Sequence, residues 1–256
     1  MINLVMVLGL GGSGKSTLAQ NITQSLTVKG FYTKSSNHIM YTTRPKRGEN
    51  DSDYTFLDPD AYITNVISTK PNPSDPEACT LLSDRFYEVE TENGSDVWRY
   101  GISIPNSSLY EKKTMEHNPK QNATYVLAAS ISQLLDVLTF MASSKKNKES
   151  INLILVVIST SEDEEDSSEK LERLRKTYLR EKESDHPNYA EVLRRFFDDD
   201  SKGEFLMRLR ENVGFGDLYR DFINCAFNYD PNKEDDQEEG YKALVQMIGY
   251  GFKIAK

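Results

Sequence analysis

Apolar residues occur along the chain with two spacings, one typical of buried strands and the other of amphipathic helices. Helical spacing is clearest after residue 15, at Leu18, Ala19, Ile22 and Leu26, and a closing helix is expected over 241–252. Continuous apolar runs predict strands buried on both faces, at 3–8, 124–129, 151–159 and 222–227, with one more strand inside 31–40. Strands that alternate with helices predict an α/β fold: a parallel sheet with helices on both faces.

A glycine-rich segment lies where the first strand turns into the first helix. Residues 9–17 read GLGGSGKST and fit the phosphate-binding pattern G-x-x-x-x-G-K-[ST]. Glycines let successive backbone N–H groups close around a phosphate, and the helix adds the positive end of its dipole. Lys15 is expected to reach the β and γ phosphates of ATP, and the Ser16 hydroxyl to bind Mg²⁺. The predicted ATP site is Gly9, Gly11, Gly12, Ser13, Gly14, Lys15, Ser16 and Thr17.

Composition narrows the classes of protein to consider. The 256 residues are 38% hydrophobic and 28% charged, which is typical of a globular protein. The net charge of −9 argues against a broad nucleic-acid surface, which needs a basic stripe. No apolar run approaches the roughly 20 residues that span a bilayer, and no secretory signal is evident, so a cytoplasmic protein is expected. The two cysteines, Cys79 and Cys225, form no metal-binding pattern.

A second cluster of candidate residues follows at 41–49, YTTRPKRGE, and 53–56, DYTF. Two arginines and a lysine fall within four residues, on a chain that Pro45 and Gly48 should bend. Guanidinium groups held this way can grip a phosphate bidentately, and a nearby tyrosine hydroxyl can donate a further hydrogen bond. A solvated basic turn is the alternative, and the residue types alone favour neither.

In these segments the chain resembles the guanylate kinase family, whose phosphate loop is followed by T-T-R-x-P-R-x-G-E and D-Y-x-F. The resemblance continues through FYE at 86–88 and YGIS at 100–103, which are similar to the family's F-x-E and Y-G-[ST] segments. It implies that the phosphate of an acceptor nucleotide is bound by Arg44, Arg47, Tyr54 and Tyr100, and that Glu88 reads guanine. Ser103 stands one step from the family's hydroxyl position.

The chain also departs from the family. Met40 and Ile102 replace hydroxyl residues that help to recognise guanine, and Ala128 and Ser130 replace aspartates near the metal and the base. Asp136 is predicted to lie on the exposed face of the next helix, and Trp98 to be a packing residue. Residues 69–84 and 198–203 look like insertions.

The resemblance implies a single domain over 1–256: a core of 1–41, 105–168 and 206–256, an acceptor lobe at 42–104 and a helical lid at 169–205. Lid arginines in the family close over the triphosphate. The matching positions are Arg180 and Arg195, with Arg194 as a close alternative, and solvated helix arginines as the other interpretation.

These features predict a nucleoside monophosphate kinase that uses ATP and Mg²⁺, with catalytic roles for Lys15, Arg44, Arg180 and Arg195. Since the attacking phosphate oxygen is already ionised, no general base is needed. GMP or dGMP is the expected acceptor. Three alternatives stay open: a kinase of another nucleotide or of nucleic acid, a non-catalytic nucleotide-binding module, and a plain NTPase.

Overall fold

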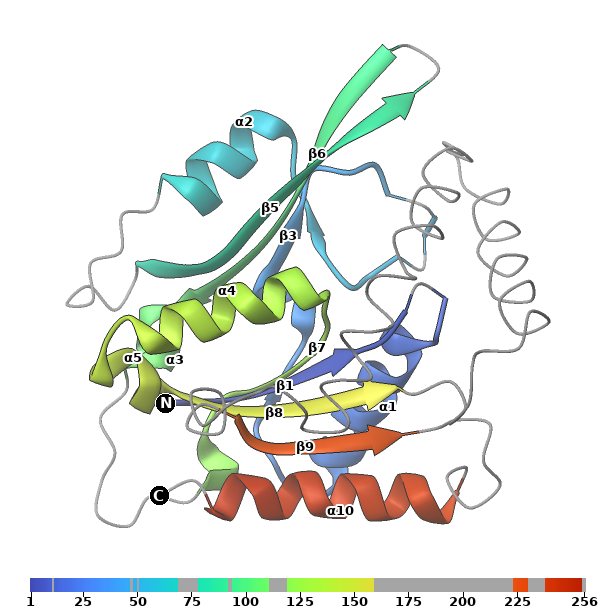
Figure 1. Cartoon of the computed structure of the whole chain (residues 1–256), viewed down its shortest axis with the longest axis vertical. Coiled ribbons are helices and arrows are strands. Elements are labelled where there is room, and N and C mark those ends of the chain that lie inside the picture. The colour runs from blue at the N-terminus through green and yellow to red at the C-terminus, as the bar shows by residue number, and fades with distance from the viewer. Residues whose placement is uncertain are drawn as a thin grey trace.

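A five-stranded parallel sheet forms the centre of the molecule (Figure 1). The computed structural model describes residues 1–10, 12–46, 48–49, 51–68, 78–91, 94–110, 119–158, 223–229 and 238–254. In sheet order the strands are β2 (Thr33–Lys34), β7 (Thr124–Ala128), β1 (Ile2–Leu8), β8 (Ile151–Ile158) and β9 (Ile223–Tyr229). The four predicted apolar strands are confirmed. The stretch 31–40 holds the two residues of β2 and the first residue of another strand, β3 (Met40–Thr42), because a 3₁₀ turn at Ser36–His38 redirects the chain between them.

Helices cover both faces of this sheet, as the apolar runs predict. Helix α4 (Ile131–Ala142) packs on one face, where Leu4 and Met6 of β1 meet Leu134. Helices α1 (Lys15–Val28) and α10 (Glu239–Ile254) pack on the other, where Val5 and Val7 lie in a second apolar cluster. Alternate residues of β1 thus enter different cores, which explains why the strand is apolar throughout.

A buried polar ladder fixes the register of the three central strands. The Asn152 amide donates to Asn3 Oδ1 (3.1 Å), and the Asn3 amide donates to Thr124 Oγ1 (3.0 Å). Both asparagines are at most 1% exposed. A shift of any of these strands would leave buried polar groups without partners, so the ladder aligns the carboxyl ends of β7, β1 and β8.

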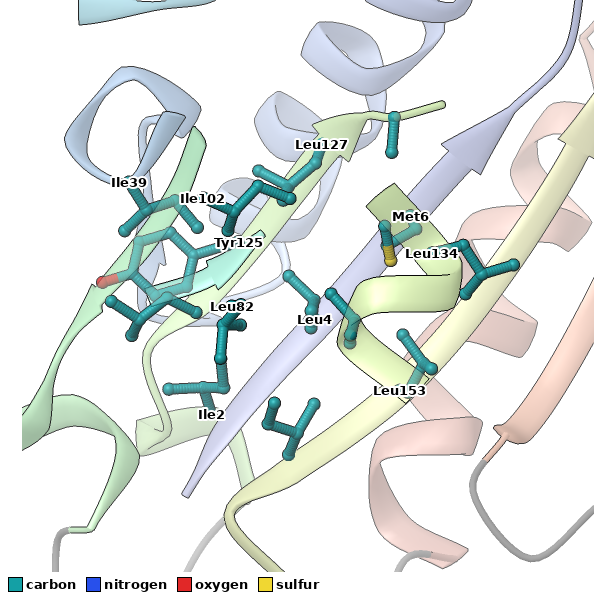
Figure 2. Packing of buried hydrophobic residues seen from close by; sticks show 14 of the residues in the cluster. Ile2, Leu4, Met6, Ile39, Leu82, Ile102, Tyr125, Leu127, Leu134 and Leu153 are labelled. Carbon is teal, nitrogen blue, oxygen red and sulfur yellow. The ribbon is translucent and has the colours of Figure 1, made fainter. Parts of the chain in front are cut away.

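A second, four-stranded sheet lies against the first. Its order is β4 (Thr55–Phe56), β3 (Met40–Thr42), β6 (Gly94–Pro105) and β5 (Cys79–Thr91). We call the side that carries Met40, Tyr100 and Ile102 the inner face, and the side that carries Arg99, Gly101 and Ser103 the outer face. Figure 2 shows Ile102 and Leu82 of this sheet packed with Ile2, Leu4 and Tyr125 of the core.

A short helical segment, α2 (Pro59–Tyr62) with a π-helical turn at Ile63–Ile67, packs on the outer face. Gly101 is required at this contact, since a Cβ there would run into the Tyr62 hydroxyl. Burial and the Asp84 carboxylate raise the pKa of Tyr62 above its usual range, so the phenol stays protonated and donates to Asp84 (2.9 Å). The outer face is therefore closed over its middle by packing.

One expectation changes with the fold. The stretch 69–84, which looked like an inserted loop, is strand from Cys79 onward, where β5 begins. The four-residue helix α3 (Asn106–Leu109) follows β6, and residues 111–118 lie outside the described part. A further short helix, α5 (Lys145–Ser150), precedes β8. No helix among the described residues is long and apolar enough to cross a membrane.

Candidate phosphate-binding site

The glycine-rich loop follows β1 at the carboxyl edge of the parallel sheet. Gly12 and Gly14 have φ angles of 77° and 84°, a region that side chains disfavour. A Cβ on Gly9 would come within 2.6 Å of Ser13 Oγ and 3.2 Å of the Ile158 Cβ, so a larger residue there would force neighbouring side chains to move. Gly12 and Gly14 are therefore required by the backbone of the loop, and Gly9 fits its close packing.

The loop surrounds the Lys15 ammonium. Lys15 Nζ donates to the carbonyl oxygens of Gly9 (2.8 Å) and Leu10 (2.6 Å), which hold the cation over the start of α1. The N-cap of α1 is Gly14, so no N-cap side chain accepts from the first N–H groups, and the first turn contains no acidic residue. Since the first N–H groups of a helix have no intrahelical acceptor, this end of α1 combines backbone donors, a positive dipole end and an ammonium group. That combination suits an anion.

Ser16 has the position and freedom expected of a metal ligand. Its side chain is half-buried in the first turn of α1, and its hydroxyl makes no hydrogen bond within the part of the chain that the structure describes. Mg²⁺ bound with a nucleotide takes most of its ligands from phosphates and water, so one protein hydroxyl fits this ion.

The neighbouring strand end contributes no carboxylate. β7 ends at Ala128, and Ser130 caps α4: its hydroxyl accepts from the Gln133 N–H (3.2 Å), while Gln133 Oε1 accepts from the Ser130 N–H (2.9 Å). Ser130 is therefore a helix cap.

Arg44 is the centre of a second cluster, on the loop after β3. Its guanidinium is only 6% exposed and forms a bidentate ion pair with Asp51, at 2.6 and 3.0 Å. Nη1 also donates to the Pro45 carbonyl oxygen (2.9 Å). These bonds use the two Nη atoms, and Nε makes no hydrogen bond to any described residue. The N–H of Nε and the second N–H of Nη2 point to the same side of the guanidinium. This side thus stays available for an anion.

Aromatic rings surround Arg44 and continue along the inner face. The guanidinium carbon lies 5.6 Å from the centre of the Tyr54 ring and 5.0 Å from that of Phe56. Tyr54 meets Tyr100 edge to face at 5.7 Å, and Tyr100 meets Tyr87 in the same way at 5.7 Å. The predicted residues Arg44, Tyr54 and Tyr100 are therefore brought together, and Tyr87 joins them.

This cluster lies beside the helix of the phosphate loop. Gln20, one turn after Ser16 on α1, donates to Asp53 Oδ1 (3.3 Å), directly before Tyr54. The segment after Asp53 is tied to the 3₁₀ turn before β3, where Thr55 Oγ1 donates to the Asn37 carbonyl oxygen (2.6 Å). The two predicted phosphate sites are therefore neighbours in space.

Two predicted acceptor residues are not brought to this cluster. Glu88 pairs with Val97, and side chains alternate along β5, so Glu88 lies on the outer face with Phe86 and Val97, exposed to solvent. Ser103 is buried on the same outer face beside Cys79. Burial raises the pKa of the Cys79 thiol, which keeps it protonated near neutral pH.

Met40 and Ile102 face each other across β3 and β6, at 1% and 0% exposure, inside the apolar cluster. The two positions that the family uses for hydroxyl recognition are thus core positions here. Trp98 is buried at 6% exposure, as predicted for a packing residue, and its indole N–H donates to Asp96 (3.2 Å).

The prediction that Asp136 lies on an exposed face is wrong. Its carboxylate is 22% exposed and binds Arg85 of β5 through two hydrogen bonds, one of them 2.8 Å from Nε, while Ser83 Oγ donates to it at 2.7 Å. The apolar spacing of α4 showed which side packs on the parallel sheet, but it did not reveal that the second sheet covers the helix flank.

Sequence reasoning also missed Asp51, Tyr87 and Arg85. Arg85 and Tyr87 lie on the same face as Tyr100 because of the register in which β5 pairs with β6, and the sequence carries no signal for that register. Four predicted residues, Gly11, Arg47, Arg180 and Arg195, lie outside the described residues, as does the whole predicted lid.

Comparison with known proteins adds no relative: no protein-family model and no curated protein matches this chain.

Proposed function

We propose that this chain is a nucleoside monophosphate kinase, which transfers the γ-phosphoryl group of ATP to the phosphate of an acceptor nucleotide, with GMP or dGMP expected first. The observation that carries the proposal is the hydrogen bond from Gln20 to Asp53, because it ties the phosphate-loop helix to the segment that bears Tyr54. A donor site and an acceptor site must be adjacent for direct transfer between two phosphates.

The donor triphosphate would bind in the glycine-rich loop. Lys15 would exchange its hydrogen bonds to the Gly9 and Leu10 carbonyl oxygens for phosphate oxygens, and the first turn of α1 would supply backbone donors. Mg²⁺ held by Ser16 and the phosphates would neutralise charge on the transferring group. Arg180 and Arg195 are proposed to close over the triphosphate from the lid.

The acceptor phosphate would bind to Arg44. Asp51 fixes the end of the guanidinium and presents the side edge, Nε and Nη2, to the ligand. Tyr54 and Tyr100 would add phenolic donors, and Arg47 a second cation. The Asp51 carboxylate also offsets part of the Arg44 charge.

Positioning and electrostatics are the whole of the catalytic task in this reaction. The acceptor phosphate is an adequate nucleophile near pH 7, so no side chain must remove a proton. What the protein must supply is alignment of the two phosphates and exclusion of water, which would otherwise hydrolyse ATP. We therefore expect the inner face of the second sheet and the lid to close on the bound nucleotides.

A coupled ADP-release assay tests the proposal. ATP and Mg²⁺ are supplied with each of a set of ribo- and deoxynucleoside monophosphates, alongside a blank without acceptor. Acceptor-dependent ADP release, with a diphosphate product seen by chromatography, supports it. Release equal to the blank with every acceptor would overturn it and leave an NTPase, a binding module or a kinase of a larger acceptor.

A further inference from the structure

The inner face of the second sheet carries an arginine at each end of a row of tyrosines. Arg44 and Tyr54 lie at the β3–β4 side, Tyr100 lies on β6, and Tyr87 and Arg85 lie on β5. Arg85 is the direct cross-strand partner of Tyr100, so both side chains stand on the same face. From β3 to β5 is two strand spacings, about 10 Å. That span matches a nucleoside monophosphate laid across the sheet from its phosphate to its base.

The chemistry of Arg85 suits the base end of such a ligand. Its Nε and Nη2 are held by the Asp136 carboxylate, and Nη2 also lies 3.4 Å from the Ser132 carbonyl oxygen. Nη1 makes no hydrogen bond to any residue in the described ranges, and the side chain is 40% exposed. Asp136 already accepts three hydrogen bonds, two from Arg85 and one from Ser83. The group that the pair offers to a ligand is therefore the N–H donor of Nη1, held in direction by a carboxylate anchored in α4.

A donor-only group distinguishes bases by their exocyclic substituents. Guanine and hypoxanthine carry a carbonyl oxygen at C6, and uracil and thymine carry one at C4, whereas adenine and cytosine carry amino groups there. An arginine N–H can donate to the carbonyl oxygens and is repelled by the amino groups. Glu88, which as a carboxylate would accept hydrogen bonds from the N1–H and amino group of guanine, lies on the other face of the sheet.

We propose that Arg85, oriented by Asp136, donates a hydrogen bond to the ring carbonyl of the acceptor base. This inference rests on the proposed kinase function and deepens it, because it gives the acceptor class: monophosphates of 6-oxopurines and 4-oxopyrimidines. Arg85 is the specificity residue, and Asp136 is a positioning residue that acts through it.

The test uses two pairs of acceptors, IMP with AMP and UMP with CMP, whose members differ at the exocyclic group and at the ring nitrogen beside it, which carries a proton only in the oxo base. The wild-type protein is expected to prefer the oxo member of at least one pair by about tenfold in kcat/KM, and also in dissociation constant measured by calorimetry. Arg85→Met is expected to reduce that ratio to about 1 while KM for ATP is unchanged. The double variant Arg85→Met with Asp136→Asn, which leaves no unpaired half-buried carboxylate, should behave in the same way.

Arg99→Met is the matched control. Arg99 forms a similar ion pair with Asp84 (2.9 Å), but on the outer face, so its removal should leave the ratio intact. An oxo-to-amino ratio that survives in both Arg85 variants, or that is lost in Glu88→Gln, would overturn the inference. If no acceptor is phosphorylated but the oxo preference in binding depends on Arg85, the kinase proposal fails and the inference holds. A protein that binds none of the four overturns the inference as well.

Discussion

The glycine-rich loop and the inner face of the second sheet are both suited to phosphates, but they are assembled over very different distances in sequence. Lys15 reaches carbonyl groups that precede it by five and six residues. Arg44, Tyr100 and Arg85 come together only because β3, β6 and β5 pair in one register. A local site depends on which residues are adjacent in the chain, whereas a sheet site depends on which face each residue occupies.

That difference determines how each region tolerates change. In the loop, Gly12 and Gly14 have positive φ angles, so a substitution at either position would strain the backbone. On the sheet, a register shift of one residue would move Tyr100 to the outer face and bring Gly101 inward. The contact of Gly101 with Tyr62 prevents this shift, so packing far from any ligand keeps the tyrosines in place.

Lys15→Ala should have the largest effect and test the local region alone. Loss of the ammonium removes charge stabilisation at the transferring phosphoryl group, so kcat should fall by about 10² to 10³. The midpoint of thermal unfolding should change little, because the bonds from Lys15 to the Gly9 and Leu10 carbonyl oxygens lie within the loop and do not hold the apolar core. Steady-state kinetics and a melting curve measure both. Lys29→Ala, at the exposed far end of the same helix, is the control, and equal losses in the two variants would contradict the loop assignment.

Ile102→Ser tests whether position 102 of the inner face is a packing position or a ligand-binding position. It restores a hydroxyl at the family's position, but this residue is fully buried in the core, so the free energy of unfolding should fall by about 3 kcal/mol. Urea denaturation measures the loss, and Ile102→Val should cost only about 1 kcal/mol. A stable Ile102→Ser protein with improved selectivity for GMP would show that this position faces a ligand after all.

The two regions also explain what could be predicted from the sequence. Apolar runs located β1, β7, β8 and β9 because buried parallel strands are apolar on both faces. The loop could be predicted because its motif is contiguous. Neither signal works for the second sheet. Glu88 was assigned to the acceptor site from its place in a short motif, but the face on which it lies depends on how β5 pairs with β6.

A bulge shows why that face was hard to foresee. The register of β5 against β6 shifts between Leu81 and Ser83, so one residue of β5 has no opposite partner there. If side chains are assigned to alternate faces from the start of β5, every residue after this bulge is therefore placed on the wrong face. Asp136 was misassigned for a related reason: the helix pattern contains no sign that Arg85, distant in sequence, lies against it.

Arg44→Lys tests the sheet region at its phosphate end. Lysine keeps the charge but loses the planar fork that pairs with Asp51 and would grip the phosphate, so kcat/KM for the acceptor should fall by about 10 to 100-fold. KM for ATP should stay within about twofold of the wild-type value. Arg99→Lys, with its ion pair on the outer face, is the matched control. An Arg44→Lys protein that loses ATP affinity and acceptor affinity equally would show that Arg44 supports the fold and does not select the acceptor.

Gln20→Ala should have the smallest effect, and it tests whether the two regions act together. The hydrogen bond from Gln20 to Asp53 is long, 3.3 Å, and exposed, so its loss should change kcat by only about twofold. Gln24→Ala, one turn further along the exposed side of α1, is the control. The informative measurement is the double variant with Arg44→Lys. The changes in kcat/KM are first converted to free energies. If the two single effects add to the double effect within about 0.3 to 0.5 kcal/mol, the loop and the sheet bind their phosphates independently. A larger coupling would mean that Gln20 transmits the placement of α1 to Arg44, because the segment that holds Asp51 and Tyr54 also contains Asp53.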